Sequence, residues 1–239
     1  MSSTANESLE YLAEGYSESA PAPPPWARID TVLLDMDGTL LDLHFDNFFW
    51  QQVIPRQYAL TRGLDVFTAQ NILRPLFDRA AGHLNWYCVD YWTRELQLDI
   101  SQLKNAHADL IQIKPDAQGF LEKLRHAKKQ TVLVTNAHQK SLALKLQRTQ
   151  LHRWLDIIVS AHEVGLAKEN PNFWSHLRAS HWFDPERTLL IDDNLSALRS
   201  AARSGIRYLY AIAQPSSRAP RVDTGEFPAI ISFREWAPA

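Results

Sequence analysis

Five short apolar runs constrain the fold of this chain more than any other feature of its sequence. Each run has the length of a strand, is rich in Val, Ile and Leu, and is continuous rather than alternating. Continuous apolar runs are typical of strands that are buried on both faces, as in a parallel sheet. The predicted strands cover residues 31–35, 131–135, 156–160, 188–192 and 208–212.

Segments with helical periodicity lie between these runs. Apolar residues recur at helical spacing on one face of 117–128 and of 139–148, and 195–204 is rich in Ala and Leu. Because strands and helices alternate along the chain, the sequence predicts a doubly wound α/β domain, with a Rossmann-like parallel sheet and right-handed crossovers.

One segment is too long to be a simple crossover. Residues 42–113 contain no strand of the parallel type, only helical periodicity and many aromatic side chains. We therefore predict a helical cap at 42–113, inserted into an α/β core made of residues 28–41 and 114–239. The aromatic residues in this segment are Phe45, Phe48, Phe49, Trp50, Trp86, Tyr87, Tyr91 and Trp92.

The first residues of the chain differ in composition from the rest. Residues 1–27 carry scattered glutamates and serines and end in a cluster of prolines. Such a stretch buries little apolar surface and is stiff where the prolines lie, which predicts a flexible tail and linker. A short helical patch that docks elsewhere is an alternative for Leu9, Tyr11, Leu12 and Tyr16.

The overall composition excludes several classes of protein. Lys and Arg number 25 against 27 Asp and Glu. Since this leaves no general positive field, we expect no nucleic-acid polymer and no membrane as a partner. The single cysteine, Cys88, argues against a disulfide framework and against cysteine-based zinc sites. The chain lacks a long apolar stretch and a secretory pattern, so we expect a cytoplasmic protein. The oligomeric state is not indicated.

Polar side chains follow three of the predicted strands. In a doubly wound sheet, ligands bind outside the carboxyl ends of the strands, so these groups are expected in one crevice. Clustered carboxylates repel one another and raise one another's pKa, and a divalent cation relieves that repulsion. Ligand oxygens without His or Cys favour a hard ion, Mg²⁺. The residues are Asp35 and Asp37, then Thr135 and Asn136, then Asp192 and Asp193.

The same residues fit phosphoryl transfer. A carboxylate such as Asp35 can attack phosphorus and form an aspartyl phosphate. It would otherwise repel the phosphate dianion, so a cation and Lys168 are required beside it. Asp37, two residues on, is placed to protonate the leaving oxygen and later to deprotonate water. Gly38 permits the sharp turn that follows.

These residues, in this order, resemble the four motifs of the haloacid dehalogenase superfamily of phosphohydrolases. The resemblance covers about residues 29–215 and implies a helical cap of the C1 type. It further implies that Asp35 is the nucleophile, that Asp37 is the acid/base, and that both contribute to Mg²⁺ binding. Thr135, with Asn136 beside it, and Lys168 would hold the phosphoryl group. Asp193 would contact the metal, with Asp192 assisting directly or through water. Many relatives carry a further acid where Ala197 stands here. The groups around the metal beyond its direct ligands are therefore not predicted.

A narrower resemblance is to the bacterial purine 5′-nucleotidases that hydrolyse GMP and IMP. It is carried by the stretches 31–43, 45–47, 84–92 and 135–138, and it implies a purine nucleoside monophosphate as substrate. Aromatic side chains of 84–92 could then stack on the base, although such residues more often form the core of a small helical subdomain. Asp90 or Asp46 could accept hydrogen bonds from guanine.

Several alternatives remain at this stage. A phosphatase or phosphomutase for sugar phosphates would share every core residue, and only the cap would separate it from a nucleotidase. A dehalogenase would not need Asp37 or the acidic pair. A phosphoacceptor signalling module shares the residue types, but there the acidic pair comes first and no cap intervenes. Outside the motifs, His138 is a candidate for ligand contact, and Cys88 for a buried thiol. His176 and His181 lie five apart and share no helix face, which argues against zinc there.

Overall fold

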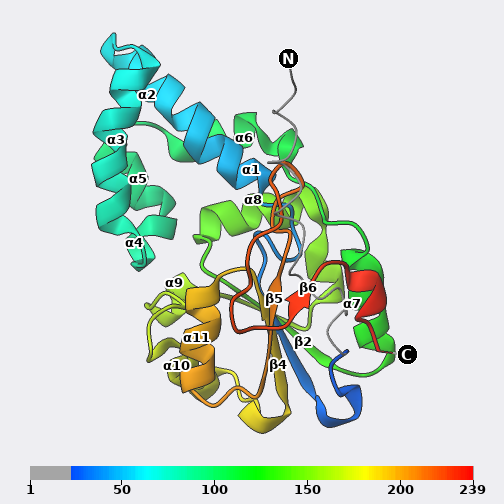
Figure 1. The fold of residues 1–239 in the computed structure, drawn as a ribbon. Coiled ribbons are helices and arrows are strands. Elements are labelled where there is room, and N and C mark those ends of the chain that lie inside the picture. The colour runs from blue at the N-terminus through cyan, green and yellow to red at the C-terminus, as the bar shows by residue number, and fades with distance from the viewer. Residues whose placement is uncertain (1–22, 239) are drawn as a thin grey trace, which may run out of the picture.

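The computed structural model describes residues 23–238 and shows one parallel sheet with helices on both faces and a helical insertion beyond one end (Figure 1). Residues 1–22, with the predicted helical patch, lie outside the described residues. The six strands of the described chain stand in the order β3-β2-β1-β4-β5-β6, and all pairs are parallel. The bounds are β1 Thr31–Leu34, β2 Gln130–Thr135, β3 Ile157–Ser160, β4 Thr188–Asp192, β5 Tyr208–Ile212 and β6 Ala229–Ile230.

The continuous apolar runs arise because each central strand is covered on both faces. In β1, Val32 and Leu34 belong to one apolar cluster, whereas Leu33 between them belongs to another on the opposite face. The first face is covered by α7 Ala117–His126 and α8 Gln139–Thr149. The second is covered by α9 Ala161–Val164, α10 Phe173–Ser180 and α11 Leu195–Arg203. The predicted doubly wound fold is confirmed.

The sheet order creates a switch point beside β1. From β1 the chain adds β2 and β3 outward on one side, whereas β4, β5 and β6 extend the sheet on the other side. The connections that leave the carboxyl ends of β1 and β4 therefore diverge, and a crevice opens between them. This geometry makes the ends of β1, β2 and β4 the expected place for a ligand.

The insertion consists of short helices joined by tight turns. The segments that enter and leave it pair with each other, since Leu41 bridges Ile113 and the Asp42 N–H donates to the Gln112 carbonyl at 2.9 Å. Its own apolar cluster centres on Phe49, Leu73 and Trp92. Its elements are α1 His44–Phe48, the π-helical η2 Phe49–Val53, α2 Ile54–Arg62, α3 Val66–Ala80, α4 Leu84–Tyr87, α5 Val89–Leu96, α6 Ile100–Ala106 and η3 Ala108–Leu110.

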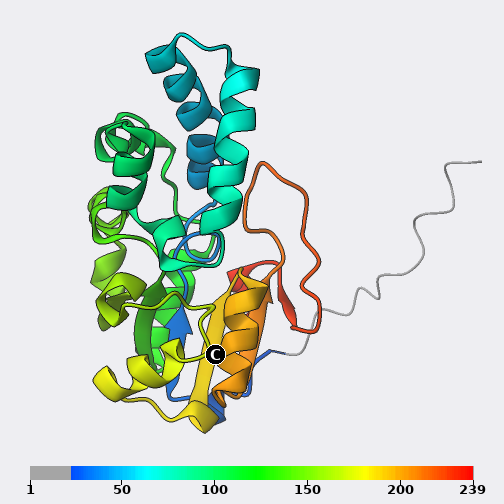
Figure 2. The ribbon, with the colours of Figure 1, turned by 90° about the vertical axis from the view of Figure 1, so that its left-hand side faces the viewer.

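The insertion stands over the carboxyl ends of the strands, as a second view at right angles to the first shows (Figure 2). The remaining described elements are short 3₁₀ helices that connect or flank the core: η1 Trp26–Arg28, η4 Leu151–Trp154, η5 Pro185–Arg187 and η6 Phe233–Glu235. Across the described residues, no helix combines the length and apolarity needed to cross a membrane.

Two features differ from the sequence prediction. The strand β6 was not predicted, because two residues that follow Pro228 are too few to form a recognisable apolar run. Trp26, which we placed in the linker, lies in η1 and packs against Phe120 with 6.3 Å between ring centroids. Lys129 further fixes this segment by donating to the Trp26 carbonyl at 2.8 Å.

Candidate active site

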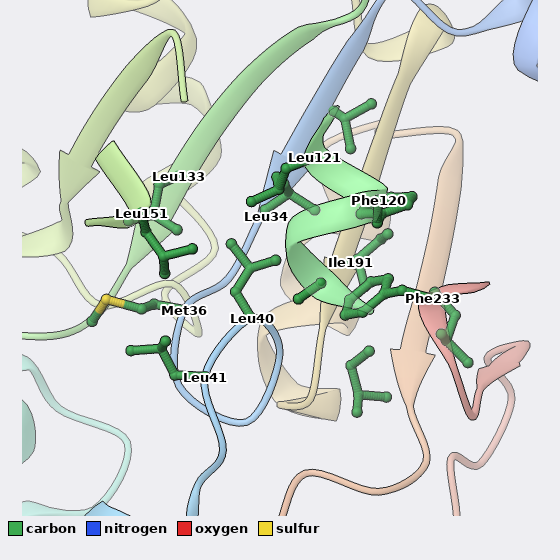
Figure 3. Close-up of a cluster of buried hydrophobic side chains, with 14 of the residues drawn as sticks. Leu34, Met36, Leu40, Leu41, Phe120, Leu121, Leu133, Leu151, Ile191 and Phe233 are labelled. Carbon is green, nitrogen blue, oxygen red and sulfur yellow. The ribbon is translucent and has the colours of Figure 1, made fainter. Parts of the chain in front are cut away.

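The loop after β1 directs its two aspartates toward a cavity, and its apolar residues are buried beneath it. Met36, Leu40 and Leu41 are at most 1% exposed and belong to the apolar cluster under α7, and Figure 3 shows them among Leu34, Leu133 and Ile191. The Met36 carbonyl accepts the N–H groups of both Leu40 and Leu41 and closes the turn. Asp35 and Asp37 flank Met36 and line a cavity at the end of the sheet.

Gly38 brings this loop against the fourth strand. Its φ of +89° lies in the left-handed region, where residues with a side chain are strained. A Cβ atom at this position would lie 2.4 Å from Oδ2 of Asp193. Glycine is therefore required both by the turn and by the close approach of the Asp193 carboxylate to the loop.

Lys168 joins the ends of two strands through its ammonium group. Its Nζ lies 2.5 Å from Oδ1 of Asp35 and 2.6 Å from Oδ2 of Asp192, and the side chain is buried. Burial disfavours the ammonium, but the two carboxylates outweigh it and raise the pKa of Lys168. Asn136 holds the backbone of this segment, since its Oδ1 accepts the Lys168 N–H at 2.9 Å. Lys168 is therefore a fixed, permanent cation.

The carboxylates of Asp35, Asp192 and Asp193 meet with one oxygen of each within 4.8 Å of the others. Burial raises the pKa of all three groups, and their mutual repulsion raises it further at Asp35 and Asp193. Oδ2 of Asp35 is buried and has no hydrogen-bond partner in the described chain. A buried oxygen without a partner, among oxygen donors only, suits a hard divalent cation.

The two acids of the last motif differ in their surroundings. Asp192 is fully buried, and its Oδ1 accepts the Asn194 N–H at 2.9 Å while its Oδ2 contacts Lys168. Asp193 is half-buried, and its carboxylate lies against the Gly38 backbone. Asp193 is therefore the member of this pair whose oxygens are free toward the cavity, and Asp192 is placed to hold Lys168.

A chain of ion pairs, in which the lysines are buried and the aspartates half-buried, extends from Asp37 into the insertion. Lys145 of α8 lies 2.7 Å from Oδ1 of Asp37 and 2.6 Å from Oδ2 of Asp46, and Lys104 of α6 lies 2.9 Å from Oδ1 of Asp46. Burial raises the pKa of Asp37 to about 6 in spite of the opposing pull of Lys145. Burial also acts on Asp46, but its two lysine partners outweigh it and lower its pKa.

Glu169 is a second junction between insertion and core. It accepts hydrogen bonds from the Tyr87 hydroxyl at 2.5 Å, from the Asn136 amide at 2.9 Å and from the Asn194 amide at 2.8 Å. Burial, together with the charge of Glu169, raises the pKa of Tyr87. Sequence reasoning did not select Glu169 or Lys145. The signal for Glu169 is its position next to Lys168. The signal for Lys145 is that it shares a buried i, i+4 face of its helix with Ser141.

Thr135 completes the polar floor of the cavity. It ends β2, is 1% exposed, and its Oγ1 accepts the Ala137 N–H at 3.0 Å. Since this contact uses only an acceptor position, the hydroxyl proton remains available to a ligand. Thr135, Asn136 and Ala137 all line the cavity, as do all seven site residues predicted from the sequence.

The cavity has a volume of about 740 Å³ and extends from these residues up into the insertion. Its aromatic lining includes Trp50 and Trp86, whose ring planes lie 25° apart with 6.2 Å between centroids. Phe77 and Tyr87 also line it. The polar and charged side chains that line its part within the insertion, apart from Asp46 and Lys104, are Asn47, Gln51, Gln70, Asn71, Arg74 and Asp78.

The residues of the insertion that could contact a nucleobase divide into two groups. Trp86 and Tyr87 line the cavity, whereas Trp92 is fully buried in the core of the insertion. Asp90 does not line this cavity and pairs with Lys140 at 2.5 Å. The expectation that Asp90 binds guanine does not fit this position, because its carboxylate faces a different surface of the molecule.

The fold and this arrangement define a hydrolase, and comparison with known proteins agrees. The chain belongs to the haloacid dehalogenase-like hydrolase family, which matches residues 29–205. It is 38% identical to the GMP/IMP nucleotidase YrfG of Escherichia coli over 214 residues, which cover 90% of this chain and 96% of the relative. The pyrimidine 5′-nucleotidase YjjG of the same organism is 27% identical over 176 residues, covering 69% of this chain and 77% of the relative.

Among solved structures, the haloacid dehalogenase phosphatase of Thermococcus onnurineus superposes with a TM-score of 0.70 at 20% identity. The match covers 87% of this chain and 95% of that chain. The family match and the nucleotidase relative confirm the predicted family and the prediction of an enzyme, a phosphoric monoester hydrolase. A phosphoacceptor module without catalysis is disfavoured by the same findings.

Proposed function

We propose that this protein is a Mg²⁺-dependent phosphomonoesterase that hydrolyses purine nucleoside 5′-monophosphates, GMP and IMP first, to nucleoside and phosphate. The observation that carries the reaction is the buried Asp35 carboxylate, with Lys168 on one oxygen and no partner on the other, facing the cavity. The purine preference is supported by the nucleotidase relative and by the aromatic lining of the cavity.

The first half of the proposed reaction uses three residues of the core. A carboxylate oxygen of Asp35 attacks phosphorus, the bond from phosphorus to O5′ breaks, and an aspartyl phosphate forms. Asp37 gives its proton to O5′, so the nucleoside leaves uncharged. Lys168 and the Thr135 hydroxyl hold the phosphoryl oxygens. A pKa of about 6 suits Asp37 to this role, because a fraction of it is protonated near neutral pH.

The second half reverses the role of Asp37. Its carboxylate now removes a proton from water, whose oxygen attacks phosphorus as the bond to Asp35 breaks, which releases phosphate and restores the nucleophile. Asp35 and Asp193, with the Asp37 backbone carbonyl implied by the family resemblance, would hold Mg²⁺. The bound ion would neutralise the charge of phosphate and carboxylates. The insertion, proposed as the cap over residues 42–113, excludes bulk water.

A substrate screen tests the proposal. Purified protein is assayed for phosphate release from GMP, IMP, AMP, CMP, UMP and hexose phosphates, with Mg²⁺ or with EDTA. We expect release that EDTA abolishes and that is fastest with GMP and IMP. Absence of metal-dependent release from every ester would overturn the proposed reaction. Faster release from pyrimidine or sugar phosphates would overturn the substrate but leave the chemistry standing.

Trp86 tests the position of the base. If the purine stacks on this side chain, Trp86→Leu loses a contact worth about 1–3 kcal/mol, and kcat/KM for GMP falls about 5- to 150-fold, mostly through KM. Ribose 5-phosphate, which has no base, should be hydrolysed at the wild-type rate. The matched control is Trp182→Leu on the core surface, where Trp182 is 70% exposed. Equal losses with both substrates would show a structural defect instead of a lost stacking contact.

A substitution at Lys145 tests whether Asp37 donates the proton to the leaving group. Among the charged groups around Asp37, Lys145 lowers its pKa, and Asp46 and Asp35 raise it. Lys145→Gln removes the lowering charge, so the pKa of Asp37 rises and the acid stays protonated to higher pH. kcat/KM reports the steps up to release of the nucleoside. The alkaline limb of its pH profile should therefore move to higher pH by about one unit or more. Lys145→Arg should keep the wild-type profile. An unchanged limb in Lys145→Gln would contradict Asp37 as the acid.

A further inference from the structure

A second cluster of potential metal ligands lies outside the cavity, where the insertion meets the core. Sγ of Cys88 and one ring nitrogen each of His138 and His162 all lie within 4.8 Å of one another. Cys88 stands between α4 and α5, His138 precedes α8, and His162 lies in α9. Figure 1 shows the end of α4 next to α9. None of the three residues lines the cavity that holds Asp35.

One ring nitrogen of this cluster has no partner, whereas Sγ of Cys88 accepts the Tyr91 N–H at 3.4 Å. Nε2 of His162 is buried, and no group of the described chain forms a hydrogen bond with it. A buried ring nitrogen without a partner is costly and calls for an explanation. Burial lowers the pKa of His162 to about 4 and also lowers that of His138, so both rings are neutral near pH 7. Neutral imidazole is the form that binds metals.

We infer that Cys88, His138 and His162 form a transition-metal site, selective for Zn²⁺, that ties the helical insertion to the core. A thiolate with two imidazoles prefers zinc to magnesium, whereas the all-oxygen set at Asp35 has the opposite preference. Asp90 is a candidate for the fourth ligand, since its Oδ2 lies 3.7 Å from Nε2 of His138. The sequence argument against cysteine-based zinc rested on the single cysteine, and the site inferred here needs only that one, together with two histidines.

Binding has a defined proton balance. Cys88 gives its thiol proton to solvent, because the thiolate is the metal ligand. Nδ1 of His138 accepts the Lys140 N–H over a long 3.3 Å, so binding through Nε2 moves the ring proton to Nδ1 and gives up this contact. Since the ligands come from both the insertion and the core, the bound ion fastens one to the other and raises Tm.

Cobalt in place of zinc tests the site without substrate. Co²⁺ is titrated into the full chain in the presence of excess Mg²⁺, which occupies the oxygen site. We expect one equivalent to give a thiolate-to-cobalt band in the near ultraviolet and the intense visible absorption of tetrahedral cobalt, and Zn²⁺ to bleach both. Cys88→Ser and His162→Gln should abolish the near-ultraviolet band. His176→Gln, which changes an exposed histidine, and Asp193→Asn, which changes the oxygen site, should retain it.

The outcomes separate this site from the proposed reaction. Wild-type protein that shows no thiolate band, or only the weak spectrum of octahedral cobalt, overturns the inference whether or not the protein hydrolyses GMP. A band that persists in His162→Gln likewise overturns it. Circular dichroism establishes that each variant is folded, and the wild-type titration decides the question even if a variant is not.

Discussion

Asp35→Asn lowers kcat/KM by at least about 10⁴-fold, the largest loss that we expect of any single substitution. An amide in place of the carboxylate cannot attack phosphorus, and loss of a nucleophile costs more than loss of a group that only orients the reactants. Asp37→Asn should lose less, about 10²–10⁴-fold, because it removes only the proton transfer. The measurement is the rate of phosphate release from GMP.

The structure also predicts that Asp35→Asn stays folded. The substitution keeps the shape of the side chain and leaves Lys168 paired with Asp192. It removes one charge from a buried group of acids whose pKa burial raises. At neutral pH, ionised carboxylates with a raised pKa destabilise the folded state. Removing one of these charges should therefore leave Tm at the wild-type value or raise it. Inactivity together with a normal Tm identifies loss of chemistry.

Covalent labelling completes this test. Wild-type protein quenched during turnover of phosphorus-labelled GMP should carry label that is lost on base treatment, as an acyl phosphate is. Asp35→Asn should carry none. A labelled Asp35→Asn protein, or one that turns over GMP at the wild-type rate, contradicts Asp35 as the nucleophile and moves the covalent step to another residue.

The core of the site was predictable because parallel strands end at a common edge. Asp35, Thr135 and Asp192 each end an apolar run, so the pairing of the strands alone brings them together. Lys168 was predictable from the family resemblance. Its position in a loop gave no geometric signal, yet its ammonium bridges Asp35 and Asp192.

The interface between insertion and core was not predictable in the same way. Lys145 lies in the middle of an amphipathic helix, where a lysine is usually solvated. Here it is buried between Asp37 and Asp46. Its role depends on how the insertion docks, and no periodicity within α8 encodes that docking. Cys88 and His162 meet for the same reason. Local sequence fixes which face of each helix is apolar, whereas the polar partners across an interface are set by tertiary contacts.

The second large effect that we expect is that of Lys168→Met, which should lower both kcat/KM and the free energy of unfolding. Without the cation, phosphate approaches a cluster of carboxylates, and kcat/KM should fall by about 10³-fold or more. Asp35 and Asp192 then remain buried without their shared partner, and breaking a buried ion pair costs about 3–5 kcal/mol of the free energy of unfolding. Urea unfolding at pH 8, without added metal, measures this loss.

The loss of stability in Lys168→Met should depend on pH in a definite direction. Lys168 lowers the pKa of both Asp35 and Asp192, so its removal raises both pKa values further above that of the unfolded chain. A group whose pKa is raised in the folded state stabilises less as pH rises through that range. The difference from wild type should therefore be small near pH 5 and largest at pH 8. Lys140→Met, at an exposed pair, should cost less than about 1 kcal/mol at both pH values. A Lys168→Met protein equally destabilised at both would show that the lysine acts by packing and not by charge.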